Sequence, residues 1–390
     1  MQHFSHLEPA TLDYLFHRPP EQVDESSDMR TRALALGATL YIPATRPGLV
    51  ATVTKRAAEG SRSMVLDLED AVADADLDMA RAAVIAALDE LADTPPDAAV
   101  FVRVRTEDDM HFVCDRLGPG LEVLTGFVLP KFRPVSGEAF LRSVSERSAA
   151  SGRHLVVMPV VESPEVVYRE TRDEELIGAR EVLGRHRDSV LAVRIGATDM
   201  SSAFGIRRDR DLTIYDVRVV ADTIGAVVNH LGRSDGTGFV VTGPVWEYFA
   251  DHERLFRPML RATPFAEHDA VRFRQQLVSR DIDGLLREVA LDRANGLHGK
   301  TVIHPSHVAA VHSLSVVTHE EYQDAQAIAS ATSGGGVMAS GYGNKMNEIG
   351  PHRPWAEQTL RRAAVFGVTA ENVSFVDVMQ ALARPRGNVA

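Results

Sequence analysis

Short apolar segments rich in β-branched residues recur along the chain, and helix-compatible stretches separate them. Near-continuous apolar runs of this length are typical of strands in a sheet that is buried on both faces. We expect eight such strands, at residues 38–44, 63–69, 100–105, 126–131, 154–162, 190–199, 238–245 and 299–305. A strand that alternates with a helix eight times predicts an α/β fold, the (β/α)8 or TIM barrel.

Both ends of the chain depart from this alternation. Residues 1–30 are rich in His, Pro and acidic residues and are expected to form an N-terminal arm. The barrel is expected over residues 31–317, with an elaborated loop at about 230–298. A C-terminal helical lid segment is expected over residues 318–390.

This C-terminal segment has three parts. Residues 318–332 predict a helix, residues 333–350 are rich in glycine, and a final helix is expected to begin near Pro354. Glycine at that density predicts a mobile segment or a pair of tight turns, because glycine adopts backbone conformations that other residues avoid.

Composition narrows the class of protein. The 390 residues are 45% hydrophobic and 25% charged, which is typical of a soluble globular protein. The net charge is −12 and no long Lys/Arg run occurs, so nucleic acid is not expected as the main partner. The single cysteine, Cys114, excludes an intramolecular disulfide and a Cys-based zinc site. The sequence shows no signal peptide and no apolar stretch of membrane-spanning length, so we expect a cytoplasmic protein.

Polar side chains end several of the expected strands. Active sites of TIM barrels lie at the C-terminal ends of the strands, so these side chains are candidates for chemistry. The two-residue period of a strand places Asp67 and Glu69 on one face, toward the barrel mouth, and likewise Arg103 and Arg105. Four later strands end in Lys131, Glu162, Asp199 and His304.

Carboxylates that converge on one rim repel each other, and a divalent cation relieves that repulsion. Glu162 and Asp199 end adjacent strands and can reach one ion, so we expect them to hold Mg²⁺, with Mn²⁺ as the other ion that carboxylates suit. Arg103 is then placed to bind a substrate carboxylate or to stabilise an enolate oxygen.

Each of these residues also has a purely structural interpretation. Asp67 lies deeper than Glu69, so an ion pair with an arginine is the favoured role for it, and Asp70 could instead cap the following helix. Lys131 could form a Schiff base, although the neighbouring acids favour ion pairing. His304 precedes a proline and could hydrogen-bond within its own loop.

Six motifs in order resemble the citrate lyase β-subunit and HpcH/HpaI aldolase superfamily. Over residues 34–318 they are SMVLDLEDAV, FVRVR, FVLPK, VVESPE, IGATDMS and GKTVIHPSHV. The resemblance implies that Glu162 and Asp199 are the Mg²⁺ ligands and that Arg103 binds the oxoacid and the nascent enolate. It also implies that Glu69 and Asp70 lie near the water shell of the metal.

The resemblance continues into the tail, where GYGNKMNEIGPH is similar to the lid segment of the family. It implies that Glu348 is the lid acid, supplied by a neighbouring subunit of a homo-oligomer, a trimer or hexamer. The family usually has Asp at the position of Glu348 and a small apolar residue at that of Asn347, which leaves the substrate open. The arm and tail resemble a divergent branch of TIM-barrel C–C bond lyases associated with bacterial tellurium-resistance and stress gene clusters.

Together these features predict a Mg²⁺-dependent lyase that cleaves carbon–carbon bonds by a retro-aldol or retro-Claisen reaction through a metal-stabilised enolate. The substrate would be a 2-oxo or 2-hydroxy acid or its acyl-coenzyme A ester. We expect catalytic roles for Arg103, Glu69, Asp70, Lys131 and Glu348, and substrate contacts from Arg103, Arg105 and His304. The alternatives are a thioester hydrolase on the same site, a metal-free aldolase that uses Lys131, and a non-catalytic component of a stress-response complex.

Overall fold

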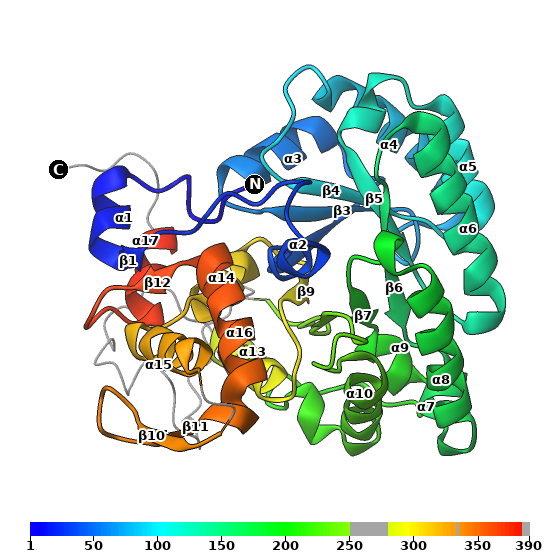
Figure 1. The fold of residues 1–390 in the computed structure, drawn as a ribbon. Helices are drawn as coiled ribbons and strands as arrows, with labels where there is room; N and C mark the ends of the chain where they lie inside the picture. The colour runs from blue at the N-terminus through cyan, green and yellow to red at the C-terminus, as the bar shows by residue number, and fades with distance from the viewer. Residues whose placement is uncertain (250–279, 333–334, 384–390) are drawn as a thin grey trace.

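A computed structural model describes residues 1–249, 280–332 and 335–383 of the chain (Figure 1). Eight parallel strands form one sheet in the order β8-β7-β6-β5-β4-β3-β2-β9. The strands are β2 (Ala38–Pro43), β3 (Ser63–Asp67), β4 (Ala99–Arg103), β5 (Leu124–Leu129), β6 (Val156–Val161), β7 (Val193–Ile195), β8 (Val241–Thr242) and β9 (Lys300–Val302). The predicted number and order of strands is therefore confirmed.

The two edge strands of this sheet approach each other. The Gly243 N–H donates to the Gly299 carbonyl at 3.2 Å, and the Thr301 N–H donates to the Gly243 carbonyl at 3.1 Å. These bonds join the end of β8 to β9, so the sheet is nearly closed into a barrel, as expected from the sequence.

Helices surround the barrel (Figure 1). They are α3 (Leu49–Ala58), α4 (Leu77–Leu91), α5 (Glu107–Arg116), α6 (Pro134–Ser151), α7 (Pro164–Val167), α8 (Arg169–Arg185), α9 (Ala197–Ser202), α10 (Arg218–Leu231), α13 (Arg280–Ala294) and α14 (Ser306–Ser315). Alternation along the strands separates two cores: Leu66 and Leu68 pack outward with the helices, whereas Val65 and Phe101 pack inward. Of the elaborated loop expected at about 230–298, residues 250–279 lie outside the described part.

The two ends of the chain pack together. Their elements are α1 (Pro9–Leu15), β1 (Phe16–Arg18), α2 (Met29–Leu34), α15 (His319–Ser330), β10 (Val337–Ala339), β11 (Met346–Glu348), α16 (Ile349–Phe366), β12 (Val368–Thr369) and α17 (Phe375–Ala383). β1 pairs with β12, and Phe4, Leu15 and Phe366 join the inner core of the barrel. The N-terminal arm therefore helps to cover the end of the barrel at which the strands begin.

The tail differs from the prediction in detail. The final predicted helix begins at Ile349, before Pro354, which lies inside α16, and α17 was not predicted. Part of the Gly-rich stretch forms an antiparallel hairpin of β10 and β11, the tight-turn alternative. No helix in the described ranges has both the length and the apolarity that a membrane span requires.

Two buried histidines hold the arm in place. The His3 Nε2 lies 2.9 Å from the Ala35 carbonyl, the Ala38 N–H donates to His312 Nε2 at 3.2 Å, and the two ring centroids are 4.6 Å apart. Burial lowers the pKa of His3 to about 3 and also lowers that of His312 well below its usual value. Both rings are therefore neutral in the folded chain.

We expect the free energy of unfolding to fall as the pH is lowered from 7 to 5. The unfolded chain binds protons at these histidines below their ordinary pKa of about 6.5, whereas the folded chain binds them only near pH 3 or below, so each costs about 2 kcal/mol at pH 5. Urea unfolding at both pH values measures this change. His3→Gln should reduce the pH dependence, and an unchanged dependence would contradict the assignment.

Candidate functional site

The C-terminal ends of β3 and β4 carry a tight ion cluster. Arg103, the last residue of β4, donates through Nε and Nη2 to the two carboxylate oxygens of Asp67, the last residue of β3, at 2.6 and 2.7 Å. Its Nη1 lies 2.8 Å from Glu69 Oε2 and 3.0 Å from Asp70 Oδ2. The predicted pairing of Asp67 with an arginine is confirmed. Asp70 does not cap a helix, because α4 begins only at Leu77.

Lys131 joins this cluster from the next strand end. Its Nζ lies 2.5 Å from Glu69 Oε1, 3.8 Å from Asp70 Oδ1 and 3.9 Å from Asp199 Oδ1. Its backbone has φ = 49°, and its N–H donates to Glu162 Oε1 at 2.8 Å. Ion pairing of Lys131 with the neighbouring acids is therefore confirmed, and its backbone also orients a second carboxylate.

Glu162 follows β6 directly and is buried. Burial, together with the nearby charge of Asp199, raises its pKa to about 8. Asp199 was expected at a strand end, which is wrong: β7 ends at Ile195, and Asp199 lies in the first turn of α9. The two acids still interact, because that short helix starts at the end of the strand adjacent to β6.

This pair fits a hard divalent cation. The charge of Asp199 raises the pKa of the buried Glu162, and a cation between the two carboxylates would relieve that repulsion. Among the described residues no group of three or more His, Cys, Asp or Glu could hold a metal. Two protein carboxylates with the remaining positions open to water and substrate is the usual arrangement for Mg²⁺.

The carboxylate of Glu162 occupies space that only a glycine leaves open. A Cβ built on Gly196 would lie 1.7 Å from Glu162 Oε2 and 2.6 Å from Glu162 Cβ. Gly196 separates β7 from α9, so the same residue ends the strand and makes room for the acid. The G-x-x-D spacing from Gly196 to Asp199 therefore positions both acids.

Arg105 and His304, which were predicted to contact substrate, form contacts with nearby segments of the chain. Arg105 donates through Nε to the Leu68 carbonyl at 2.8 Å and also contacts Asp74 and the Val72 carbonyl, so it fastens the loop that carries Glu69. His304 follows β9; its Nδ1 lies 2.7 Å from Ser306 Oγ, and its ring stacks on Phe249 at 4.9 Å. The hydrogen bond within the loop is thus present, and substrate contacts from Arg105 and His304 stay predictions.

Glu348 lies away from the rim cluster in this chain. It ends β11, its side chain is exposed, and its N–H donates to His352 Nδ1 at 3.1 Å. Within the described residues no hydrogen bond or ion pair joins it to the rim. Its role as a lid acid stays a prediction.

Two site residues were not predicted from the sequence. Tyr41 and Arg194 point into the barrel from β2 and β7, beneath the rim cluster: the Arg103 Cζ lies 5.2 Å from the Tyr41 ring centroid, and the Arg194 Cζ lies 5.6 Å from it. The two-residue period of ATLYIP places Tyr41 on the inner face, and a charged residue inside an apolar strand was a visible signal for Arg194.

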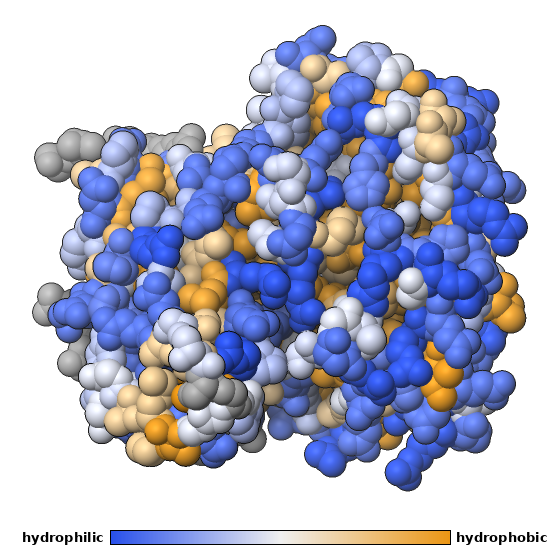
Figure 2. Space-filling model, in the orientation of Figure 1, coloured by the Kyte–Doolittle hydropathy of each residue, from blue (hydrophilic) through white to orange (hydrophobic). Residues whose placement is uncertain are grey.

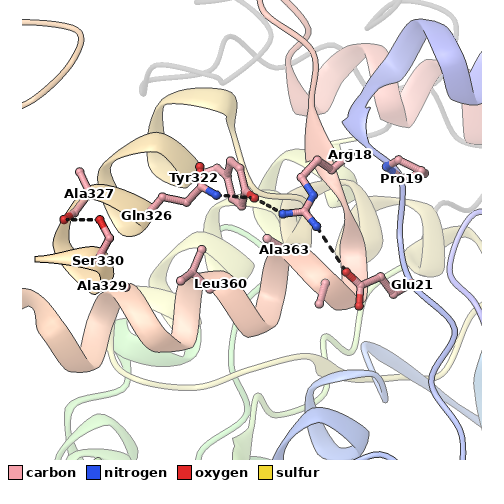
Figure 3. Close-up of a pocket in the computed structure, with 11 residues that line it drawn as sticks. Arg18, Pro19, Glu21, Tyr322, Gln326, Ala327, Ala329, Ser330, Leu360 and Ala363 are labelled. Carbon is pink, nitrogen blue, oxygen red and sulfur yellow. Dashed lines mark hydrogen bonds and ion pairs between the residues drawn. The ribbon is translucent and has the colours of Figure 1, made fainter.

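A cavity of about 640 Å³ lies elsewhere, among β1, α15 and α16 (Figure 3). Arg18 contacts the Tyr322 hydroxyl there and lies 3.7 Å from Glu21, while Leu360 and Ala363 line the cavity. It has no pair of buried carboxylates among its described lining residues. The barrel mouth is therefore the better candidate for metal-assisted chemistry.

Solved structures with this fold come from several organisms. Protein CitE from Mycobacterium tuberculosis, in complex with magnesium, acetoacetate and coenzyme A, is 22% identical over 84% of this chain and 97% of its own, with a TM-score of 0.52. A citrate lyase from Burkholderia xenovorans LB400 is 16% identical over 90% and 96%, with a TM-score of 0.60. Haloferax volcanii malate synthase is 13% identical over 75% and 75%, with a TM-score of 0.51. At these identities the likeness establishes the fold alone.

Sequence comparisons give a sharper result. No curated protein sequence matches the chain significantly. A family model described as the C–C bond lyase of the TIM-barrel fold matches residues 30–368, which include the whole barrel and most of the C-terminal helical segment. The chain therefore belongs to the C–C bond lyase family of the TIM-barrel fold.

Proposed function

We propose that this chain is a Mg²⁺-dependent lyase that cleaves a carbon–carbon bond of a 2-oxo or 2-hydroxy acid or of its acyl-coenzyme A ester. The observation that carries the proposal is the meeting of Glu162 and Asp199 beside the cations Lys131 and Arg103 at the barrel mouth. Membership of a C–C bond lyase family and the magnesium and coenzyme A bound by the similar protein CitE support it.

Glu162 and Asp199 would hold the cation, and Mn²⁺ suits the same oxygen ligands. When bound, the cation supplies positive charge that stabilises the negative oxygen left by bond cleavage. Arg103 adds a second positive charge on the same side, and its two bonds to Asp67 fix its plane. Held rigidly in this way, the guanidinium needs little rearrangement as charge develops on the substrate.

Glu69 and Asp70 are suited to opposite proton-transfer roles. Burial raises the pKa of Glu69. Burial also acts to raise that of Asp70, but its hydrogen bond with Glu69 and the charges of Arg103 and Lys131 outweigh burial and lower it. Adjacent carboxyl groups with diverging pKa values can divide acid and base roles. In this proposal Glu69 keeps its proton longer and acts as the acid, and Asp70 accepts a proton.

A metal-free mechanism through Lys131 fits the contacts less well. A Schiff base requires a neutral amine, and although burial acts to lower the pKa of Lys131, the hydrogen bond and charge of Glu69 raise it. The ammonium group is therefore the stable form and is held by acids. Its role in this proposal is to orient Glu69.

We further propose that the lid acid Glu348 acts in a neighbouring copy of the chain, in a trimer or hexamer. The hairpin before it exposes Val337 (59%) and Met346 (61%), and apolar surface is visible over β10 and β11 in Figure 2. A second copy that covered this surface would bury it and bring Glu348 to a barrel mouth. A monomeric molar mass at micromolar concentration would contradict this arrangement.

Calorimetry tests the proposed function. We expect pyruvate, oxaloacetate or glyoxylate to bind only when Mg²⁺ is present, because the ion would contribute contacts to the acid. Glu162→Gln should lose both Mg²⁺ binding and acid binding, since it removes a buried carboxylate ligand. Glu165→Gln, which changes a nearby glutamate on α7, is the matched control and should bind as the wild type does. Binding that is indifferent to Mg²⁺ and to Glu162→Gln would refute the assignment.

A further inference from the structure

The floor of the barrel beneath the rim cluster contains a buried arginine. The side chain of Arg194 is 1% exposed and crosses from β7 to the far strands. It donates through Nη1 to Thr39 Oγ1 at 3.2 Å and through Nη2 to Thr301 Oγ1 at 2.5 Å. Its Nε has no hydrogen-bond partner among the described residues. The Tyr41 hydroxyl is a further hydrogen-bond partner, so all three of these oxygen partners are neutral hydroxyls.

Arg194 lacks a counter-charge, unlike the rim cations. Arg103 and Lys131 are each paired with two or more carboxylates, whereas no ion pair joins Arg194 to an acid in the described ranges. A buried guanidinium without a carboxylate is costly, because burial removes its hydration and neutral hydroxyls replace only part of it. A charge kept in this state at the bottom of a ligand site points to an anion that arrives with the ligand.

Tyr41 lies between this charge and the barrel mouth. Its ring contacts both Arg194 and Arg103, and it is partly exposed although its strand neighbours Leu40 and Ile42 are buried. Arg194, Arg103, Asp67 and Glu162 all act electrostatically on its hydroxyl. Burial raises its pKa, so the phenol is protonated at neutral pH and can donate a hydrogen bond.

We propose that Tyr41 and Arg194 form an anion-recognising floor of the site, in which the Tyr41 hydroxyl donates to a carboxylate oxygen of the substrate and Arg194 supplies the buried positive charge. Arg194 is a positioning residue, since it acts through Tyr41. This inference rests on the proposed function, because it assigns the ligand of the same site. It requires a substrate with a free, ionised carboxylate that reaches the barrel floor.

Tyr41→Phe tests the hydrogen bond. With saturating Mg²⁺, we expect the tightest binder among pyruvate, oxaloacetate and glyoxylate to lose about 10- to 100-fold in affinity, the range for a hydrogen bond to a charged group. The affinity for Mg²⁺ alone should be unchanged. Tyr14→Phe, at a 64% exposed position, is the matched control. Wild-type affinity of Tyr41→Phe for the acid would overturn the inference.

Arg194→Met tests the charge, because it should change the affinity for the acid and the affinity for Mg²⁺ in different directions. Loss of the buried charge should weaken the same acid at least about 10-fold, whereas Mg²⁺ alone should bind as tightly or more tightly, because a nearby positive charge is gone. A merely structural role would weaken both, and that result would overturn the inference. Arg194→Lys should keep part of the acid affinity, and Arg218→Met, at an 82% exposed side chain, should change neither.

Failure of this inference is distinguishable from failure of the proposed function. If Glu162→Gln loses Mg²⁺ but Tyr41→Phe and Arg194→Met bind the acid normally, only the barrel floor is assigned wrongly. If none of the three acids binds to the wild type, or if Glu162→Gln binds Mg²⁺ and acid normally, both proposals fail.

Discussion

Replacing Gly196 with alanine is expected to weaken Mg²⁺ binding by about 100-fold, the upper range for residues that orient metal ligands. The added Cβ would lie 1.7 Å from Glu162 Oε2, so the carboxylate must leave its present position. The other oxygen cannot easily follow, because it accepts the Lys131 N–H at 2.8 Å. The single methyl group therefore acts on the proposed ligand itself.

The backbone does not explain this effect. Gly196 has φ = −99°, outside the left-handed region that favours glycine, so the expected loss comes mainly from the contact with Glu162. The Cβ would also lie 2.6 Å from Glu162 Cβ, and overpacking of this kind costs about 1–3 kcal/mol of stability. After a loss of that size, most molecules of a domain this long remain folded.

Calorimetric titration with Mg²⁺, together with a urea unfolding curve, separates the two effects. Gly184→Ala is the control: it lies in α8 with nothing within 4 Å of the added Cβ, and it should bind Mg²⁺ normally. The double variant Gly196→Ala with Glu162→Gln should bind no more weakly than Glu162→Gln alone. Normal Mg²⁺ affinity in a folded Gly196→Ala variant would contradict the assignment of Glu162.

The barrel and most of its rim could be predicted from local sequence. Strand periodicity placed Leu66 and Leu68 outward and Asp67 inward, which the packing confirms, because a two-residue period fixes side-chain direction wherever one face is buried. The rule that strand ends carry the chemistry of such barrels then brought Glu69 and Glu162 to one rim. The order of the strands along the chain and the residues at their ends were sufficient to predict both the direction of these side chains and their place at the rim.

Other features depended on contacts between distant segments. The side chain of Arg105 follows Arg103 at the predicted two-residue spacing, but the strand ends at Arg103, and backbone carbonyls of the preceding loop take its donors instead. Asp199 lies in a helix because Gly196 ends the strand early. The unpaired charge of Arg194 could be recognised only when its surroundings were known. No local pattern contains that information.

Lys300→Met is expected to lower the free energy of unfolding by about 3–5 kcal/mol, the range for breaking a buried ion pair. Lys300 is fully buried, and its Nζ lies 2.9 Å from Glu288 Oε1 and 2.7 Å from Asp292 Oδ2. Methionine keeps much of the volume but leaves both acids without this charge. Arg208 still contacts Glu288, so the loss of the Lys300 charge affects Asp292 more than Glu288.

This cluster was invisible in the sequence, where Lys300 stands in an apolar strand and its two partners stand on a separate helix, α13. The acids of this cluster also hold a segment that lies next to the candidate site. The Ile214 N–H donates to Glu288 at 2.7 Å and the Tyr215 hydroxyl donates to Asp292 at 2.8 Å, so the segment that follows Asp199 and α9 is held against α13 and β9. Loss of Lys300 should therefore loosen this segment before the rest of the barrel.

The pH dependence of Lys300→Met separates lost charge from lost packing. Burial already raises the pKa of Asp292 to about 6, and removal of Lys300 should raise it further. From about pH 4 up to the raised pKa of Asp292, which lies above 6 in the variant, the folded variant binds more protons than its unfolded chain. Its free energy of unfolding therefore rises as the pH falls through this range. At both pH 8 and pH 5 the free energy of unfolding of the variant is subtracted from that of the wild type. The opposing effect of the histidines is present in both proteins and cancels in this difference.

We expect that difference to be clearly smaller at pH 5 than at pH 8, as measured by urea unfolding. Lys55→Met, at a 65% exposed side chain, should stay within about 1 kcal/mol of the wild type at both pH values. Adding Glu288→Gln and Asp292→Asn to Lys300→Met should recover part of the lost stability, because neutral amides need no counter-ion. A loss that is equal at both pH values and persists in the triple variant would instead assign Lys300 a packing role.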